Sequence, residues 1–81
     1  MAEQEMRPIF RVEMAYRQRY YFWAVWDNGT LPVGSLTHQM FVKGLDMSKV
    51  VEVTEYPPCA GDDFEARVAK LEIEDHTPTP F

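Results

Sequence analysis

Cysteine is almost absent from this chain of 81 residues, which contains one, Cys59. A single cysteine cannot form an internal disulfide bond, so no covalent link holds this small fold together. The two histidines, His38 and His76, lie far apart in the sequence, and no close ligand pair of the C-x₂-C kind is present. The sequence therefore predicts no metal site and no cofactor, and the free thiol favours a reducing, cytoplasmic location.

Long apolar runs and an excess of basic residues are also lacking. No segment approaches the roughly 18 apolar residues of a membrane-spanning helix, and the acidic N-terminus has no apolar core of a signal peptide. The net charge is −5, and residues 46–81 contain nine acidic against three basic residues. Proteins that bind nucleic-acid phosphates usually present a net basic surface. We therefore expect no membrane segment, and direct nucleic-acid binding is disfavoured.

The motifs of nucleotide-binding and catalytic sites are missing as well. The four glycines form neither G-x-G-x-x-G nor G-x-x-x-x-G-K-[ST]. Cys59 has Glu55, Asp62 and Asp63 as its acidic neighbours in the sequence, and negative charge opposes formation of a reactive thiolate. Adjacent carboxylates such as those of Asp62 and Asp63 diverge, whereas acid–base catalysis needs them to converge in a cleft. The sequence thus predicts that the protein is not an enzyme.

What the chain does contain is a dense aromatic run, YYFWAVW at residues 20–26, followed by Asp-Asn-Gly. Aromatic and β-branched residues favour strands, and Asn-Gly is a strong signal for a tight hairpin turn. The run predicts a strand over 19–27 that is apolar on both faces and therefore lies in the middle of a sheet. An alternating pattern that opens at Pro8 predicts the preceding strand. The residues expected on its apolar face are Phe10, Val12, Met14 and Tyr16.

The next segments are less regular. Ser35 is expected to cap a helix that runs through Lys43 and stops at Gly44, and a strand over 40–42 is the alternative. Any strand over 30–34 is short and lies at a sheet edge, because Pro32 has no amide donor. Residues 49–56 are rich in β-branched side chains and predict another strand, which the pair of prolines at 57–58 ends.

A second helix is expected towards the C-terminus. Asp62 is predicted as its N-cap, with Glu65 completing a capping box, and Phe64, Val68 and Leu71 form one apolar stripe. A strand with a bulge at residue 69 is the alternative.

These elements predict one α+β domain over residues 8–73. It consists of a small antiparallel sheet of three to four strands, with one or two short helices packed on one face. Residues 1–7 are predicted to be a flexible N-terminus, and residues 74–81, which contain two prolines, an extended C-terminal tail.

The expected function is that of a small, acidic protein-binding module, an inhibitor or adaptor that docks on a larger protein. Tryptophan and tyrosine near arginine are typical of interface hot spots, and acidic side chains steer association with a basic partner. Nucleic-acid-binding proteins are one class of partner with such a basic surface. In being short, acidic and free of motifs, the chain is similar in type, not in sequence, to small phage-encoded inhibitors of host defence. The predicted partner-binding residues are Tyr21, Trp23, Glu52, Glu55, Asp62, Asp63 and Glu65.

Two alternatives stay open. Small β domains hold single-stranded nucleic acid with basic residues interleaved among aromatic ones, each stacked base contributing about 1–3 kcal/mol. The residues that would do so here are Arg17, Arg19, Tyr20 and Trp23. The other alternative is a structural subunit that buries its aromatic face in a homodimer or a larger assembly. All three functions depend on whether the second face of the strand over 19–27 is exposed.

Overall fold

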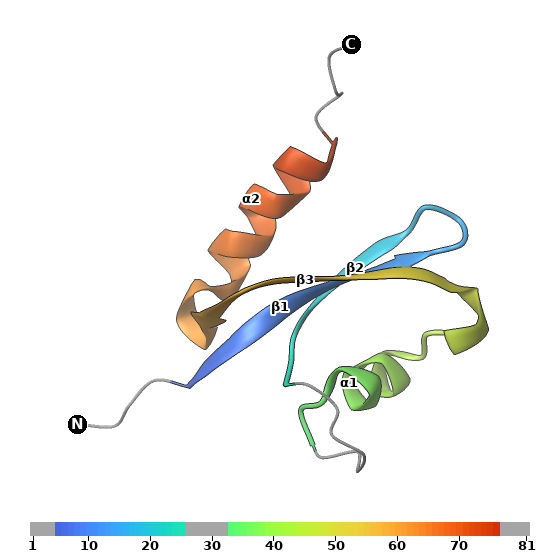
Figure 1. Cartoon of the computed structure of the whole chain (residues 1–81), viewed down its shortest axis with the longest axis horizontal. Helices are drawn as coiled ribbons and strands as arrows, with labels where there is room; N and C mark the ends of the chain where they lie inside the picture. Colours follow the sequence, from blue (N-terminus) through green and yellow to red (C-terminus); the bar gives the residue numbers. More distant parts are fainter. Residues whose placement is uncertain (1–4, 26–32, 77–81) are drawn as a thin grey trace.

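The structure is a computed structural model that describes residues 5–25 and 33–76. Within these ranges the chain forms strands β1 (Met6–Met14) and β2 (Arg19–Trp23), helix α1 (Leu36–Lys43), strand β3 (Val50–Ala60) and helix α2 (Phe64–His76) (Figure 1). Two short 3₁₀ helices, η1 (Met47–Lys49) and η2 (Gly61–Asp63), flank β3. The strands form one antiparallel sheet in the order β2-β1-β3, which confirms the predicted small α+β class.

β1, and not the aromatic β2, lies in the middle of the sheet. The prediction that the aromatic strand is central is wrong because the hairpin pairs β2 with β1 on one side, while β3 pairs with the opposite side of β1. β2 also ends at Trp23. Beyond it, Val25 forms an isolated parallel bridge with Ser35, and Val25 N donates to Gly34 O at 3.0 Å. The predicted Asn-Gly turn lies outside the described residues.

The turn between β1 and β2 begins earlier than predicted. Met14 N donates to Gln18 O at 2.8 Å, and Arg17 adopts a left-handed backbone with φ 66°. Tyr16 therefore lies in the turn and is 75% exposed, instead of sharing the apolar face of β1. The remaining positions of that face, Phe10, Val12 and Met14, are buried as predicted.

The hydrophobic core lies between the β2–β1 part of the sheet and α1. Alternation along β1 and β2 directs every second side chain to this face, and α1 contributes Leu36 and Met40, one helical turn apart. The buried members of this core are Phe10, Val12, Met14, Phe22, Ala24, Leu36 and Met40.

Helix α1 confirms the predicted capping residues. The Ser35 Oγ accepts a hydrogen bond from His38 N at 3.1 Å, and this buried serine satisfies one of the free amides at the helix start. At the other end Gly44 is left-handed, with φ 84°, and its N–H donates to the carbonyls of Met40 and Phe41. The helix reading of residues 36–43 is therefore correct, and the strand alternative is wrong.

Gly44→Ala is expected to lower the free energy of unfolding by about 1 kcal/mol, because a side chain at positive φ strains the backbone. A Cβ at this position would meet no atom within 4 Å, so the loss is purely conformational. Urea unfolding followed by circular dichroism measures it. Gly44→Asn is the control and should lose less, since asparagine tolerates this conformation. Equal stability of wild type and Gly44→Ala would contradict the proposed cap.

β3 continues through the two prolines that were predicted to end it. The register of β3 against β1 shifts between the pairs Arg7↔Cys59 and Ile9↔Tyr56. Two residues of β3, Pro57 and Pro58, therefore face one residue of β1 in an irregular stretch where the ladder is interrupted. Proline lacks an amide donor, so a bulge in an edge strand is a position where it does not break the sheet.

Helix α2 differs from its prediction at both ends. The helical segment begins with η2 at Gly61, so Asp62 lies inside it and is not its cap, and the preceding Ala60 has no side-chain cap bond. At the other end α2 runs to His76, so residues 74–76 of the predicted extended tail are helical. The first proline after α2 is at position 78. Because a proline disfavours helical backbone only in the residue directly before it, a helix that ends at His76 is compatible with it.

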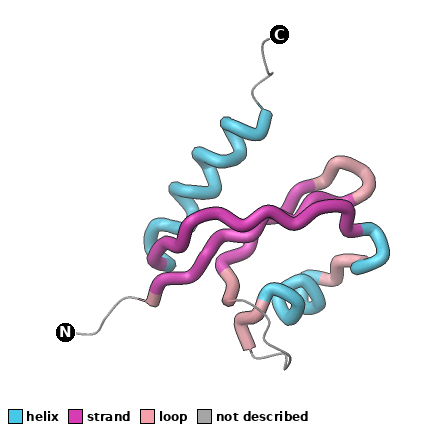
Figure 2. Tube along the Cα trace, in the orientation of Figure 1, coloured by secondary structure: helices cyan, strands magenta, loops and turns pink. Residues whose placement is uncertain are grey.

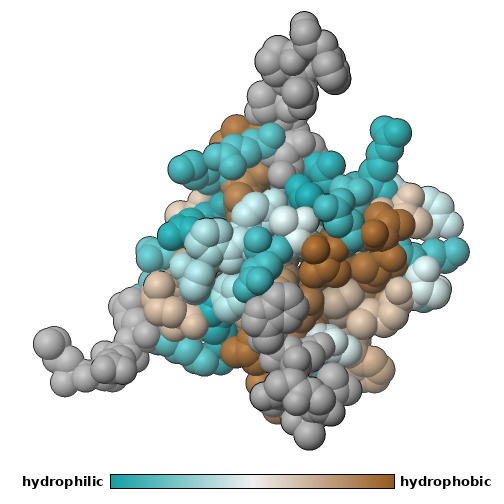
Figure 3. Space-filling model, viewed as in Figure 1, coloured by the Kyte–Doolittle hydropathy of each residue, from teal (hydrophilic) through white to brown (hydrophobic). Residues whose placement is uncertain are grey.

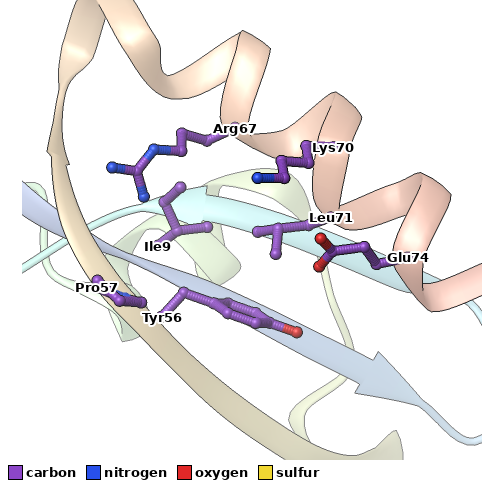
Figure 4. A pocket seen from close by; sticks show the side chains of 7 residues that line it. All are labelled: Ile9, Tyr56, Pro57, Arg67, Lys70, Leu71 and Glu74. Atoms are coloured by element: carbon purple, nitrogen blue, oxygen red, sulfur yellow. The ribbon is translucent and has the colours of Figure 1, made fainter.

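The two helices lie on opposite sides of the sheet (Figures 1 and 2). α1 covers the face of Phe10, whereas α2 lies over the other face, where Leu71 and the long side chains of Arg67 and Lys70 border a hollow above Ile9 and Tyr56 (Figure 4). Ile9 has no exposed surface. The expectation that the helices pack on one face is therefore not confirmed, because α1 and α2 lie on opposite faces. The predicted stripe of α2, Phe64, Val68 and Leu71, is half-buried. None of the helices in the described residues is long and apolar enough to span a membrane.

Candidate protein-binding surface

Trp23, the predicted docking residue, makes contacts that tie β2 to the ends of β1 and β3. Its Nε1 donates to Cys59 O at 2.9 Å, and the Arg7 guanidinium lies 4.5 Å from the centre of the ring. A Cβ on Gly61 would lie 3.1 Å from the ring, so the glycine allows the indole to approach η2. Trp23 is half-buried in this position. Its ring therefore serves the fold and is not a freely exposed anchor.

Arg7 itself is held on several sides. Its Nη2 donates to Glu5 Oε2 at 2.9 Å, and its Nε lies 2.8 Å from Glu5 Oε1 without a well-directed hydrogen bond. A Cβ on Gly34 would lie 3.1 Å from Arg7 Nη1. The cation thus bridges the indole of Trp23 and the segment before α1, and stacking on the ring adds a cation–π attraction of about 1 kcal/mol.

Tyr21 lies on the same sheet face as Trp23, and it is half-buried. Its cross-strand neighbour is Arg11, whose Nη2 donates to Thr54 Oγ1 of β3 at 3.2 Å. In the next row, Arg19 Nε donates to Glu13 Oε1 at 2.9 Å. The face beneath α2 is therefore an ordered mixture of aromatic rings and paired charges.

The residues of the nucleic-acid alternative do not come together on one surface. Tyr20 lies on the α1 face, where it packs against the core and has Lys43 Nζ 5.3 Å from its ring centre. Trp23 lies on the opposite face, and Arg19 is engaged with Glu13. Arg17 is exposed in the β1–β2 turn. Two aromatic rings on opposite faces cannot stack successive bases of one strand.

The five predicted acidic residues are all exposed and follow β3 to its C-terminal end. Glu52 faces the α2 side of the sheet, in register with Glu13, and Glu55 faces the α1 side, in register with Phe10. Asp62 and Asp63 lie in η2, and Glu65 in the first turn of α2. The acidic residues therefore form two groups, one on β3 and one beyond its end.

Several large apolar side chains that the sequence reasoning did not select are exposed near α1 and β3. Two of them are adjacent on α1, where Phe41 is 79% and Val42 71% exposed. We call the exposed apolar residues around α1 the α1 patch and those on β3 the β3 strip. The α1 patch consists of Val33, Phe41, Val42 and Met47, and the β3 strip of Val51 and Val53.

Hydrogen bonds of α1 show how the α1 patch is oriented. Gln39 Nε2 donates to Trp23 O at 2.8 Å and to Gly34 O at 3.0 Å, which places Gln39 on the β2 side of the helix. Residues two apart in a helix differ by about 200° in direction, so Phe41 faces away from β2, towards the side on which β3 lies. Phe41 and Met47 border one apolar hollow of about 340 Å³.

Val53 of the β3 strip lies on the same side of the sheet as α1, whereas Val51 lies at a second register shift, between the pairs Glu13↔Glu52 and Met14↔Val50. Val53 is in register with buried Val12, and α1 covers the β2–β1 part of this face. In Figure 3, hydrophobic side chains gather over the first half of β3, next to hydrophilic ones. Phe41 and Met47 of the α1 patch and Val53 therefore offer apolar surface on one side of the molecule, with Glu55 beside it. Val33 and Val42 border another hollow, with Phe22 and Gln39 on the β2 side.

Asp46 adds a fixed negative charge next to the α1 patch. Its Oδ1 accepts hydrogen bonds from the Ser48 hydroxyl at 2.7 Å and from Ser48 N at 3.0 Å. Both bonds favour the ionised form and lower the pKa of Asp46 below its ordinary value of 3.8. Because the folded pKa is lowered, the carboxylate stabilises the fold above this ordinary value, and its contribution is lost as the pH falls through the lowered pKa.

The described residues contain no group of three or more side chains that could bind a metal ion. Cys59 is buried. The chain was compared with protein-family models, with curated proteins and with solved structures, and no match was found.

Proposed function

We propose that this protein is a small, non-enzymatic protein-binding module, an inhibitor or adaptor whose docking surface comprises the α1 patch, the β3 strip and the acidic residues beside them. The observation that carries the proposal is the exposure of Phe41, 79%, and Met47, 46%, which border one apolar hollow. Contiguous exposed apolar surface is uncommon on small soluble proteins and marks interaction sites. Burial of one such side chain against a partner contributes roughly 1.5–3 kcal/mol.

Charge favours a basic partner. The chain has a net charge of −5, and Glu55 and Asp46 border the apolar surface. Exposed acids of this kind mainly accelerate association with a positive surface and make the association rate sensitive to salt. The expected partner is a larger protein with a basic, partly apolar surface. Proteins that bind nucleic acids belong to this class.

The docking surface proposed here differs from the one expected from the sequence. Tyr21 and Trp23 contribute to the proposal only indirectly, because the contacts of Trp23 with Arg7, Cys59 and Gly61 hold the sheet together. The acidic residues Glu52 and Glu55 keep their proposed role. Asp62, Asp63 and Glu65 lie beyond the end of β3 and would add only to the long-range negative field.

A matched pair of substitutions tests the proposal. Phe41→Ser and Tyr16→Ser each remove an exposed aromatic side chain, 79% and 75% exposed respectively, from different places on the surface. Partners captured with the wild-type chain from cells that make it are identified by mass spectrometry, purified, and titrated calorimetrically against all three proteins. We expect Phe41→Ser to weaken binding by about 30-fold, as for a hot-spot residue, and Tyr16→Ser to leave it unchanged.

Unfolding in urea establishes that both variants remain folded, which surface substitutions of this kind permit. Equal binding by wild type and Phe41→Ser would overturn the proposed surface. A concentration-dependent dimer in sedimentation, lost in Phe41→Ser, would instead assign the surface to a second copy of this chain.

A further inference from the structure

No other strand of the described residues covers the outer edge of β3. β3 pairs with β1 on one side, and no described residue pairs with it on the other. In an antiparallel strand alternate residues direct their N–H and C=O groups to each side, so about half of the backbone groups from Glu52 to Tyr56 point outwards, while the ladder is irregular at Val51. The usable edge ends at Tyr56, because Pro57 and Pro58 have no amide donors.

On the α1 face, an apolar row crosses the sheet and stops at this edge. Tyr20 of β2 is in register with Val12 of β1, which is in register with Val53 of β3. Val12 has no exposed surface, whereas Val53 is 43% and Val51 60% exposed. An apolar side chain from a fourth strand would bury what remains exposed of Val53.

On the α2 face, a row of charges ends unbalanced at the same edge. Arg19 of β2 is paired with Glu13 of β1 at 2.9 Å, and Glu52 of β3 is in register with Glu13. Like charges directly opposite each other destabilise a sheet. The contact that Glu52 makes is a long one, 3.5 Å from Thr54 Oγ1. A cation opposite Glu52 would neutralise the row, whose charges would then run positive, negative, negative, positive.

These two rows lead us to propose, on the basis of the proposed function, that β3 accepts an extended basic segment of the partner as a fourth strand. In this segment an apolar residue faces Val53 and a neighbouring lysine or arginine faces Glu52. Main-chain hydrogen bonds to the edge supply affinity, and the two faces supply specificity.

A second copy of β3 fits this edge less well. Antiparallel self-pairing centred on Glu52 places two glutamates opposite each other, and centring it on Val53 places Glu55 opposite Val51 and offers Glu52 no cation. Each copy also carries a charge of −5. The chemistry of the edge therefore selects a basic strand.

The test uses a synthetic heptapeptide of alternating lysine and valine, and as controls an alternating glutamate and valine peptide and a peptide with the lysines and valines in two blocks. Calorimetry measures affinity, and amide hydrogen exchange followed by NMR locates binding. We expect the alternating lysine peptide to bind at least tenfold more tightly than both controls and to protect amides within Val50–Tyr56.

Charge reversal on the edge provides the second arm. Glu52→Lys should weaken the alternating lysine peptide about tenfold and improve binding of the glutamate peptide, while Asp63→Lys, which changes the same charge beyond the end of β3, should leave the ranking of the peptides unchanged. Binding of both lysine peptides alike, or binding without protection of β3 amides, overturns strand addition. If the Phe41→Ser result above holds while this test fails, the protein-binding function stands and only the strand mode falls.

Discussion

Phe10→Ala is expected to lower the free energy of unfolding by about 3–5 kcal/mol, the cost of removing a fully buried phenylalanine. Phe10 has no exposed surface and lies on the central strand, in register with Phe22 of β2 and on the face that α1 covers. A domain of this length has a total stability of roughly 4–10 kcal/mol. The variant should therefore be largely or partly unfolded at 25 °C, as measured by urea titration with circular dichroism.

Val51→Ala is the control for this core substitution. Val51 is 60% exposed, and surface replacements away from special features usually change stability by less than about 0.5 kcal/mol. Phe10→Leu, which keeps the site apolar but removes part of the volume, should lie between the two. A loss of less than about 1 kcal/mol in Phe10→Ala would contradict a core built on this face of β1.

The sequence correctly predicts those elements in which the local pattern and the tertiary packing agree. Alternation along β1 identifies Phe10, Val12 and Met14 because one face of that strand is buried. Ser35 and Gly44 mark the ends of α1 because their capping bonds are local. These signals require no knowledge of where other parts of the chain lie.

Strand order and edges are not local properties, and the sequence reasoning failed there. The aromatic pattern of β2 resembles that of a central strand, although β2 lies at an edge of the sheet, with Phe22 in the core that α1 completes. The prolines of β3 look like a terminus, but they occupy a bulge that exists only because β3 pairs with β1. The exposure of Phe41 depends likewise on Gln39, whose bonds to Trp23 O and Gly34 O fix the rotation of α1.

The surroundings of Trp23 were equally out of reach. Arg7 contacts its indole from one end of the chain, and Cys59 and Gly61 from a second segment far along the sequence. Nothing in the run around residue 23 predicts these contacts. An aromatic residue on the second face of a strand has two common uses, docking and packing. The free energy of unfolding of Trp23 variants distinguishes these two uses.

Trp23→Ala is expected to lower the free energy of unfolding by about 2–3 kcal/mol, less than for a fully buried tryptophan because the ring is half-buried. Trp23→Phe should lose about 1–2 kcal/mol, since it keeps a ring beside Arg7 but leaves Cys59 O without its donor. Urea unfolding by circular dichroism measures both, with Tyr16→Ala as the exposed aromatic control. A docking anchor would behave in the opposite way, because its removal would weaken partner binding and leave stability unchanged. If Trp23→Ala unfolds at the same urea concentration as wild type, the indole does not join the strands.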